Sequence, residues 1–268
     1  MAKPERISSA ANPLLKEVRR AVARGTLTAD GCCVAETFHL LEEALRSDCE
    51  VRVVLAAERV RSAVEAHVRR LAGVRVAVLP DELFEGVAGT ETSQGVIALV
   101  RPPAWTIEQL FRGTSLVVVL DGLQDPGNAG AICRAAEAFG ATGVLFLKGA
   151  VSPHNPKAVR AAAGSLFRVP FVAGVDGALA RAAMRQHKLD VWAAVPARPD
   201  GRTTRLEDAD LARPCAMVVG SEGHGVGLAL RSAAIDLSIP TVGVESLNAA
   251  VAAGILLYEA RRQRSRKP

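Results

Sequence analysis

Apolar positions in the second half of the chain form short continuous runs with helical patterns between them. The first run, Ser115 to Leu120, is rich in β-branched residues and is typical of a strand buried on both faces of a parallel sheet. Similar runs follow at 143–147, 190–195 and 215–219. Helical patterns lie between the runs, at about 129–139, 155–163 and 176–187. This alternation predicts an open α/β sheet, in which ligands bind beyond the carboxyl ends of the strands.

The first hundred residues also alternate between helical and strand patterns. Asn12 to Ala23 predicts a helix in which Asn12 is the N-cap and Pro13 takes the first helical position. Further helices are expected at 37–45 and 60–71, and a short one, capped by Asp81, is expected to end at Gly86. Strands are expected at 51–55, 74–79 and 95–100. The pattern predicts a small α/β sandwich.

A break in the pattern separates the two halves. Arg101 is followed by two prolines, and only a short helical piece, Thr106 to Phe111, precedes the next strand. Adjacent prolines favour a semi-rigid joint. The sequence therefore predicts a first domain at 1–100, a linker at 101–113 and a second domain at 114–268.

The C-terminal stretch predicts a strand, a turn and a long helix. The strand is expected at 235–239, and the turn contains Pro240 and Gly243. The helix is expected to begin near Ser246, because apolar residues then recur at helical spacing through Tyr258. Small residues at 249–254 would let another backbone approach this helix closely.

Composition narrows the class of protein. Aromatic residues make up only 4% of the 268 residues, which argues against a nucleic-acid surface made of stacked rings. We find no apolar run of transmembrane length and no secretory apolar segment at the start, so we expect a cytoplasmic protein with no membrane contact. The five cysteines show no metal-ligand spacing, and their odd number favours reduced thiols and no metal site.

Charge is unevenly distributed along the chain. The formal net charge of +5 divides into −1 for residues 1–100 and +6 for residues 101–268, and five basic residues lie in 261–268. A basic domain with a basic tail suits a polyanionic partner, although solubility would also explain it.

Three polar or glycine-rich loops follow predicted strands of the second domain. The first contains Asn128 and Gly130, with Arg134 in the helix that follows, a combination that suits an anion. The second, 220–227, has four glycines in eight residues and one acidic side chain, Glu222. It does not match a dinucleotide fingerprint or a P-loop. The third presents Ser246 and Asn248. Each could be a simple helix cap or surface turn if it stood alone.

Together, and in this order, the three loops resemble the three motifs of the SpoU (TrmH-like) RNA 2′-O-ribose methyltransferases of the SPOUT superfamily. The residues that carry the resemblance are Asn128, Gly130, Arg134, Gly220, Glu222, Gly223, Ile239, Pro240, Ser246, Leu247 and Asn248. The match covers roughly residues 115–262. Residues 1–100 resemble the L30e-like RNA-binding domain that many members carry, with Thr37 standing where the family often has glycine.

The resemblance implies a fold, a cofactor and an activity. The fold is a SPOUT-type parallel α/β sheet with a deep trefoil knot, preceded by the L30e-like domain and assembled as a homodimer. The cofactor is S-adenosylmethionine (AdoMet). The activity is methylation of a ribose 2′-hydroxyl, and large-subunit (23S) ribosomal RNA is the expected substrate. Transfer RNA, a catalytically silent RNA-binding protein and an unrelated small-molecule binder are the alternatives.

The resemblance also implies roles for individual residues. Cofactor contacts are expected from Gly220, Glu222, Gly223, Ile239, Leu247 and Asn248. Arg134 would hold a phosphate and stabilise the developing alkoxide, because a guanidinium is too weak a base to remove the proton. Asn128 and Asn248 would orient ribose or cofactor, and Ser246 would hydrogen-bond the target nucleotide. Glu222 would tie the cofactor loop to its neighbours.

Overall fold

The chain divides into two compact units in a computed structural model, which describes residues 4–69, 73–90, 92–197 and 202–265. The first unit consists of Met1–Ala104 and His154–Arg168, and the second of Trp105–Pro153 and Val169–Pro268. The end of the predicted helix 60–71 and the last three residues of the basic tail lie outside the described residues.

The first unit is built on a five-stranded mixed sheet with the order β1-β4-β3-β5-β2. Its strands are β1 (Glu5–Arg6), β2 (Cys33–Glu36), β3 (Glu50–Ala57), β4 (Arg75–Leu79) and β5 (Val96–Arg101). Strands β1, β4 and β3 are parallel, and β5 runs antiparallel to β3 and β2. The sequence predicted three of these strands and did not predict β1 or β2.

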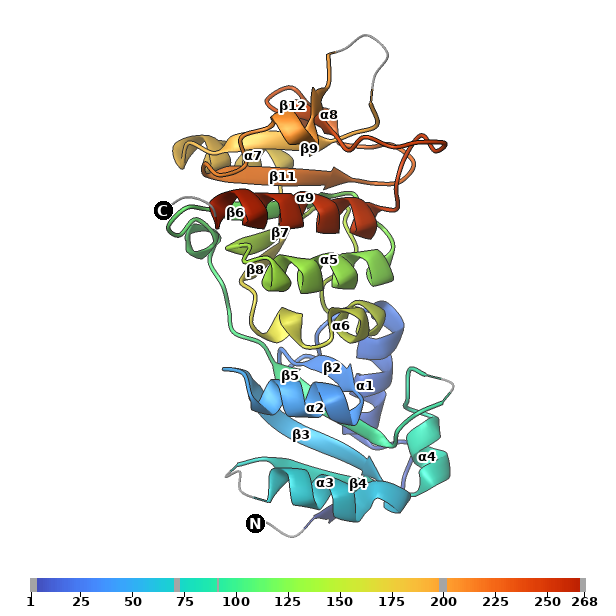
Figure 1. Ribbon diagram of the computed structural model, residues 1–268. Helices are drawn as coiled ribbons and strands as arrows, with labels where there is room; N and C mark the ends of the chain where they lie inside the picture. Colours follow the sequence, from blue (N-terminus) through green and yellow to red (C-terminus); the bar gives the residue numbers. More distant parts are fainter. Residues whose placement is uncertain (1–3, 70–72, 91, 198–201, 266–268) are drawn as a thin grey trace. The chain divides into compact units, whose positions relative to one another are not determined.

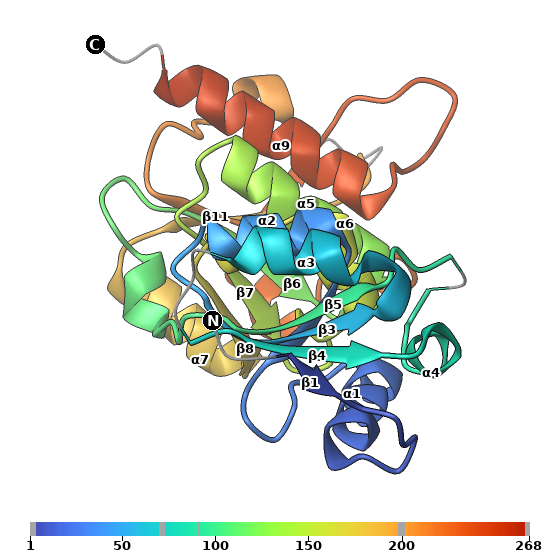
Figure 2. The same ribbon diagram turned by 90° about the horizontal axis from the view of Figure 1, so that it is seen from below.

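Helices cover both faces of this sheet (Figure 2). The helices of this unit are α1 (Pro13–Arg24), α2 (Phe38–Leu45), α3 (Arg61–Val68), α4 (Asp81–Glu85) and α6 (Pro156–Ala162), with short 3₁₀ turns η1 (Glu58–Val60) and η3 (Ser165–Phe167), and α6 contacts the edge strand β2. Helices α1 and α4 lie on one face, and α2 and α3 lie on the other. Alternate residues of β3 therefore enter two cores, and Val53 and Leu55 join the core that includes Leu15 of α1 and Phe84 of α4.

Helix caps in this unit test the sequence predictions directly. Asn12 caps α1, its side chain accepting from Leu14 N at 2.9 Å, and Pro13 is the first helical residue, as predicted. Thr37 caps α2 with a φ of 135°, a conformation that favours glycine. The predicted cap at Asp81 is wrong, because α4 begins at Asp81 itself and its carboxylate instead accepts from Arg59 N at 3.2 Å.

The segment 154–168 packs within the first unit, although the sequence grouped it with residues 114–268. Arg160 of α6 lies 3.5 Å from the buried carboxylate of Glu36, which also accepts from Gly89 N at 3.1 Å. Arg168 lies 2.6 Å from Glu43. The two ion pairs join residues more than a hundred positions apart, and apolar periodicity does not reveal such contacts.

The second unit is built on a seven-stranded sheet with the order β10-β12-β9-β11-β6-β7-β8, and all its strand pairings are parallel. Its strands are β6 (Leu116–Asp121), β7 (Gly143–Leu147), β8 (Phe171–Val175), β9 (Asp190–Ala194), β10 (Thr204–Arg205), β11 (Cys215–Gly220) and β12 (Ile235–Ser238). The predicted parallel α/β sheet is confirmed, while β8 and β10 were not predicted.

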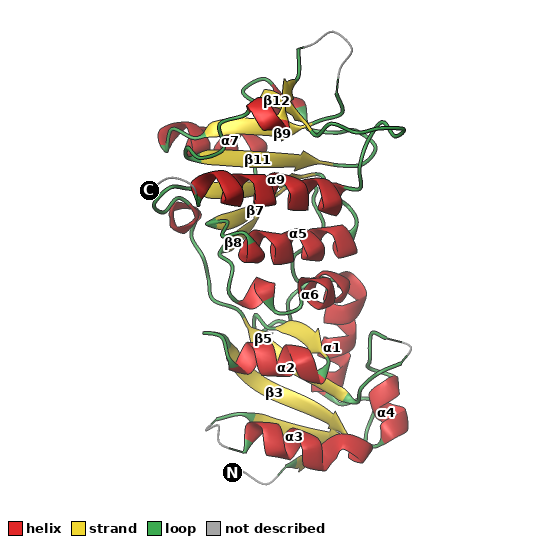
Figure 3. Ribbon diagram, viewed as in Figure 1, coloured by secondary structure: helices red, strands yellow, loops and turns green. Residues whose placement is uncertain are grey.

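Helices pack on both faces of the parallel sheet (Figures 1 and 3). They are α5 (Pro126–Ala138), α7 (Gly177–Gln186), α8 (Leu228–Arg231) and α9 (Ala249–Arg264), with 3₁₀ turns η2 (Ile107–Leu110) and η4 (Leu206–Asp208). Helices α5 and α9 pack side by side on one face, and α7 and α8 pack against each other on the other. No helix among the described residues is both long enough and apolar enough to cross a membrane.

Acidification should weaken the first unit through His154. Burial lowers the pKa of this histidine from 6.5 to about 4, so the folded protein binds fewer protons than the unfolded chain between these values. The resulting stability is fully present above pH 6.5 and is lost as the pH falls towards 4. We expect a loss of about 2 kcal/mol in the free energy of unfolding between about pH 7 and pH 5.

This loss is measured by urea unfolding at both pH values, with circular dichroism as the signal. His154→Gln keeps a polar side chain that does not titrate, so its loss of stability between the two pH values should be smaller than that of the wild type by about 2 kcal/mol. An equal loss in this variant and the wild type would show that other groups are responsible.

Candidate functional site

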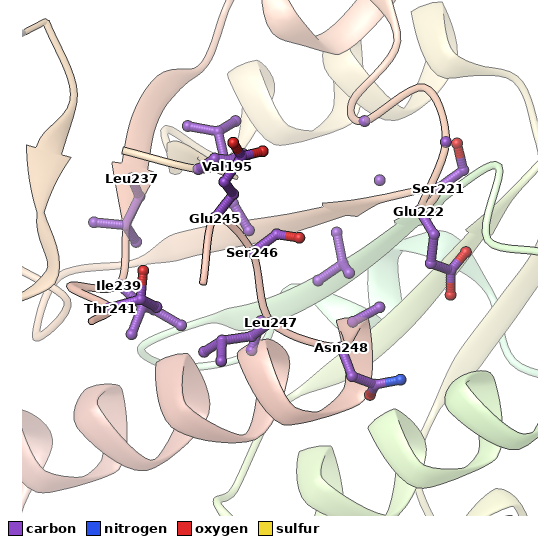
Figure 4. A pocket seen from close by; sticks show the side chains of 18 residues that line it. Val195, Ser221, Glu222, Leu237, Ile239, Thr241, Glu245, Ser246, Leu247 and Asn248 are labelled. Carbon is purple, nitrogen blue, oxygen red and sulfur yellow. The ribbon is translucent and has the colours of Figure 1, made fainter. Parts of the chain in front are cut away.

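A cavity of about 540 Å³ lies at the carboxyl ends of β9, β11 and β12. Its walls come from the residues after β9, from the glycine-rich loop after β11, and from the chain that joins β12 to α9. Leu237, Ile239 and Leu247 supply apolar surface, and Glu222 and Glu245 supply carboxylates. Figure 4 shows Ile239 and Thr241 on one side of the cavity and Ser221 and Glu222 on the other.

All six residues expected to contact a cofactor line this cavity: Gly220, Glu222, Gly223, Ile239, Leu247 and Asn248. Ser246 also lines it, whereas Asn128 and Arg134 are not among the lining residues. The cavity is thus formed by the second and third loops, and the first loop meets it through hydrogen bonds.

A chain of side-chain hydrogen bonds joins the three loops. Asn128 Nδ2 donates to Glu222 Oε1 at 2.7 Å, and Asn248 Nδ2 donates to Asn128 Oδ1 at 3.0 Å. Asn248 Oδ1 in turn accepts from Ala250 N at 2.9 Å and from Val251 N at 3.3 Å. We refer to Asn248, Asn128 and Glu222 as the amide relay.

The direction of the amide relay is fixed at both ends. An ionised carboxylate such as Glu222 only accepts, so Asn128 must present its NH₂ group to it. The Asn128 oxygen then faces Asn248, which must donate, and the Asn248 oxygen is left to cap α9. Both amide orientations follow from this network, and the bond to Glu222 is charge-assisted.

The glycine-rich loop after β11 is shaped by backbone contacts. Ser221 and Gly225 exchange two backbone hydrogen bonds, at 2.9 and 3.2 Å, which fold the loop back on itself. A methyl group on Gly220 would collide with the backbone of Gly225 and Val226. The position therefore requires glycine, because no side chain fits between the two strands of the loop.

Asp121 holds the far end of the same loop. Its carboxylate, in the last residue of β6, accepts from Gly227 N at 2.7 Å. Sequence reasoning assigned no role to Asp121, nor to the lining residues Val195, Thr241 and Glu245. The sequence feature that could have identified Asp121 is its position at the end of a buried strand, directly before the first loop.

Two helix starts differ from the sequence prediction. Asn128 was placed before its helix, but α5 already begins at Pro126, and Asp125 is the cap that accepts from Asn128 N at 2.6 Å. The last helix was expected to begin near Ser246, but α9 begins at Ala249 with Asn248 as its cap. In both cases a second residue able to cap lies close by in sequence and takes the position.

Arg134 lies on the exposed side of α5. Within the part of the chain that the structure describes, its guanidinium forms no hydrogen bond or ion pair, so it is available to an anion. The adjacent Cys133 is fully buried, and burial raises the pKa of its thiol to about 12, as suits a packing residue. His224 is exposed. The described residues contain no group of three or more His, Cys, Asp or Glu side chains placed to hold a metal ion.

Comparison with known proteins gives matches over both units. Residues 115–258 match the model of the SpoU rRNA Methylase family, and residues 12–98 match that of the MRM3-like substrate binding domain. The 23S rRNA (guanosine-2′-O-)-methyltransferase RlmB of Ralstonia nicotianae is 38% identical over 204 residues, covering 74% of this chain and 80% of that protein.

Two further relatives extend over nearly the whole chain. The 23S rRNA (guanosine(2553)-2′-O)-methyltransferase RlmP of Bacillus subtilis is 31% identical over 264 residues, covering 96% of this chain and 99% of that protein. The crystal structure of the SpoU methyltransferase AviRb from Streptomyces viridochromogenes with the cofactor AdoMet has a TM-score of 0.84 and 26% identity, covering 96% and 100% of the two chains. The protein described here belongs to the SpoU rRNA methylase family.

Proposed function

We propose that this protein transfers a methyl group from AdoMet to a ribose 2′-hydroxyl of 23S ribosomal RNA. The observation that carries the proposal is the cavity at the carboxyl ends of the strands, lined by all six residues expected to hold the cofactor. Two of the relatives described above are named as 23S ribosomal RNA 2′-O-methyltransferases, which favours this substrate over transfer RNA.

The cavity fits AdoMet in size and chemistry. A volume of about 540 Å³ lies in the range of pockets that enclose small ligands. Leu237, Ile239 and Leu247 offer apolar surface to an adenine ring, and the close backbone approach at Gly220 leaves amides and carbonyls for its edge. Glu222 and Glu245 suit the positive charges of the ligand. When bound, AdoMet supplies an electrophilic methyl group on a sulfonium.

The protein's own residues would position the 2′-hydroxyl and stabilise the negative charge that develops on its oxygen. The amide relay holds the first loop at the cavity, and this brings the helix that carries Arg134 into the same site. Arg134 would bind a phosphate beside the target ribose and stabilise the alkoxide that develops on the 2′-oxygen. The proton would pass to phosphate or water, because guanidinium holds its own proton too strongly. Ser246 would hydrogen-bond the target nucleotide.

The first unit would serve as an L30e-like RNA-binding domain. Lys16, Arg20 and Arg24 recur every four residues on one face of α1, and all three are exposed. Among the described residues, none of these three side chains has an ion-pair partner. A row of free cations on one helix face suits the phosphates of an RNA backbone.

The proposal includes the trefoil knot and the homodimer of the family. Supporting the knot, the chain leaves β12 near one edge of the sheet and returns as α9 to pack on α5 and β11. Supporting a dimer, the exposed side chains of Val242, Val244, Val251 and Tyr258 offer apolar surface. A cytoplasmic location follows from a ribosomal RNA substrate.

Transfer of labelled methyl from AdoMet to separated ribosomal and transfer RNA tests the function. We expect label in ribosomal RNA at a position that resists alkaline cleavage, because a methylated 2′-oxygen cannot attack the neighbouring phosphate. Label confined to transfer RNA would support the transfer RNA alternative. No label in either pool, with RNA still bound, would support a silent RNA-binding protein.

Gly220→Ala should disrupt cofactor binding. The added methyl can be accommodated only if the loop 220–227 opens, so we expect AdoMet affinity to fall at least about tenfold, or about 1.4 kcal/mol. Gly254→Ala is the matched control, because a methyl at this position of α9 meets nothing within 4 Å and Gly254 does not line the cavity, so its affinity should stay within about threefold of wild type. Calorimetric titration measures both, and wild-type affinity in Gly220→Ala would refute the assignment of the loop.

Substitution of Arg134 should separate catalysis from cofactor binding. Arg134 does not line the cavity, so Arg134→Ala should leave AdoMet affinity unchanged while lowering kcat about 10²–10³-fold. Arg134→Lys keeps the charge but loses the planar fork, and an intermediate rate is expected. Single-turnover methylation measures the rates. Full activity in the lysine variant would rule out the fork as the catalytic feature.

A further inference from the structure

A second, larger cavity of about 1150 Å³ lies in the second unit, away from the cofactor site. Its walls are one face of α7, the residues leading into β9 and β11, and the residues between α8 and β12. Each of these segments precedes a strand of the parallel sheet or packs beside such a segment. The cavity therefore lies at the amino ends of the strands, whereas the cofactor cavity lies at their carboxyl ends. We refer to it as the amino-edge groove.

The amino-edge groove is strongly basic. Arg181, Arg185, Lys188 and Arg213 line it, and Asp190 is the acidic lining residue, which leaves a formal charge of +3. Arg181 and Arg185 lie one turn apart on α7, so both extend from the same face. On that face they alternate with Ala178 and Ala182, whose small side chains leave room for a bulky ligand.

Among the described residues, two of the four cations have no protein partner. Arg213 lies 3.5 Å from Asp190, and Arg181 Nη1 donates to Ala229 O at 3.4 Å. The side chains of Arg185 and Lys188 are exposed and form no hydrogen bond or ion pair within residues 4–69, 73–90, 92–197 and 202–265. The groove thus presents two cations without a partner among the described residues, together with two that the protein already holds in place.

Lys188 occupies a backbone position that favours glycine. Its φ is 56°, in the left-handed region, at the turn that ends α7. The turn is closed by hydrogen bonds from Lys188 N to Arg185 O at 3.1 Å and from Leu189 N to Met184 O at 3.0 Å. Glycine or asparagine is usual at such a helix end. A lysine at this position adopts a strained backbone conformation and places a positive charge in the groove.

We infer that the amino-edge groove binds the phosphate backbone of the RNA substrate, away from the target nucleotide. The inference rests on the proposed function. Arginine forks and a lysine suit phosphate oxygens. An open groove with about twice the volume of the cofactor cavity, and with exposed cations, suits a polyanion that runs through it better than one enclosed anion. Contacts of this kind set the position of the RNA without reading its sequence.

The double variant Arg185→Ala with Lys188→Gly tests the inference. Glycine removes the charge and relieves the left-handed backbone at position 188, so the variant is expected to fold, which circular dichroism and an unchanged AdoMet affinity verify. We expect weaker binding of ribosomal RNA at low salt. The slope of log K against log salt, from filter binding between about 50 and 200 mM, should become less negative by about 1.4–1.8 for two lost phosphate contacts.

A control of equal charge is available in the same unit. Arg112→Ala with Arg205→Ala also removes two exposed cations, neither of which lines the groove. It should keep an RNA affinity and salt slope close to wild type. Equal RNA affinity and slope in the groove variant and this control would overturn the inference.

Competition between RNA and a free polyphosphate tests whether the groove binds an RNA backbone or a free anion. Tripolyphosphate should compete with RNA only weakly if the groove holds an extended backbone. Loss of tripolyphosphate binding in the groove variant, with RNA binding intact, would identify a site for a free anion and overturn the inference. A wild-type protein that binds ribosomal RNA with this salt dependence but transfers no methyl group would reject the proposed function and leave the groove inference standing.

Discussion

The hydrogen bond from Asn128 to Glu222 is the interaction on which the rest of the site depends. It joins residues 94 positions apart, and the bond from Asn248 to Asn128 joins residues 120 positions apart. Together they hold the start of α5, the glycine-rich loop and the start of α9 at one place. Because a carboxylate can only accept, a single charged group sets the orientation of both amides, and the second amide also caps the helix that closes the cavity.

The parallel sheet explains how such distant residues meet. Strands buried on both faces leave few polar positions along their length, so polar side chains gather where the strands end. The carboxyl edge carries the acidic and amide groups of the cofactor cavity, and the amino edge carries the cations of the groove. If the RNA contacts both edges, the carboxyl edge of the sheet holds the methyl donor and the amino edge binds the phosphate backbone. Neither site then disturbs the packing of the strands that lie between the two edges.

Much of this architecture could be predicted from the sequence, because buried strands leave long apolar runs. Strands of two residues, such as β1 and β10, leave no such signal, and β8 contains Gly174, which interrupts its pattern. The predicted cap positions differ from the observed ones by two or three residues where two residues able to cap stand close together, as with Ser246 and Asn248. Asp121 and the amino-edge groove were missed because their roles depend on partners that only the fold brings near.

A double-mutant cycle between Asn128 and Glu222 tests the central claim, that the amide relay joins the loops into one site. AdoMet affinity would be measured by calorimetry for Asn128→Ala, Glu222→Ala and the double variant. The account predicts a coupling of about 0.5–3 kcal/mol, because either single change already breaks the link between the loops. Single effects that add to the double effect within about 0.3 kcal/mol would show that the two residues act independently, and would contradict it.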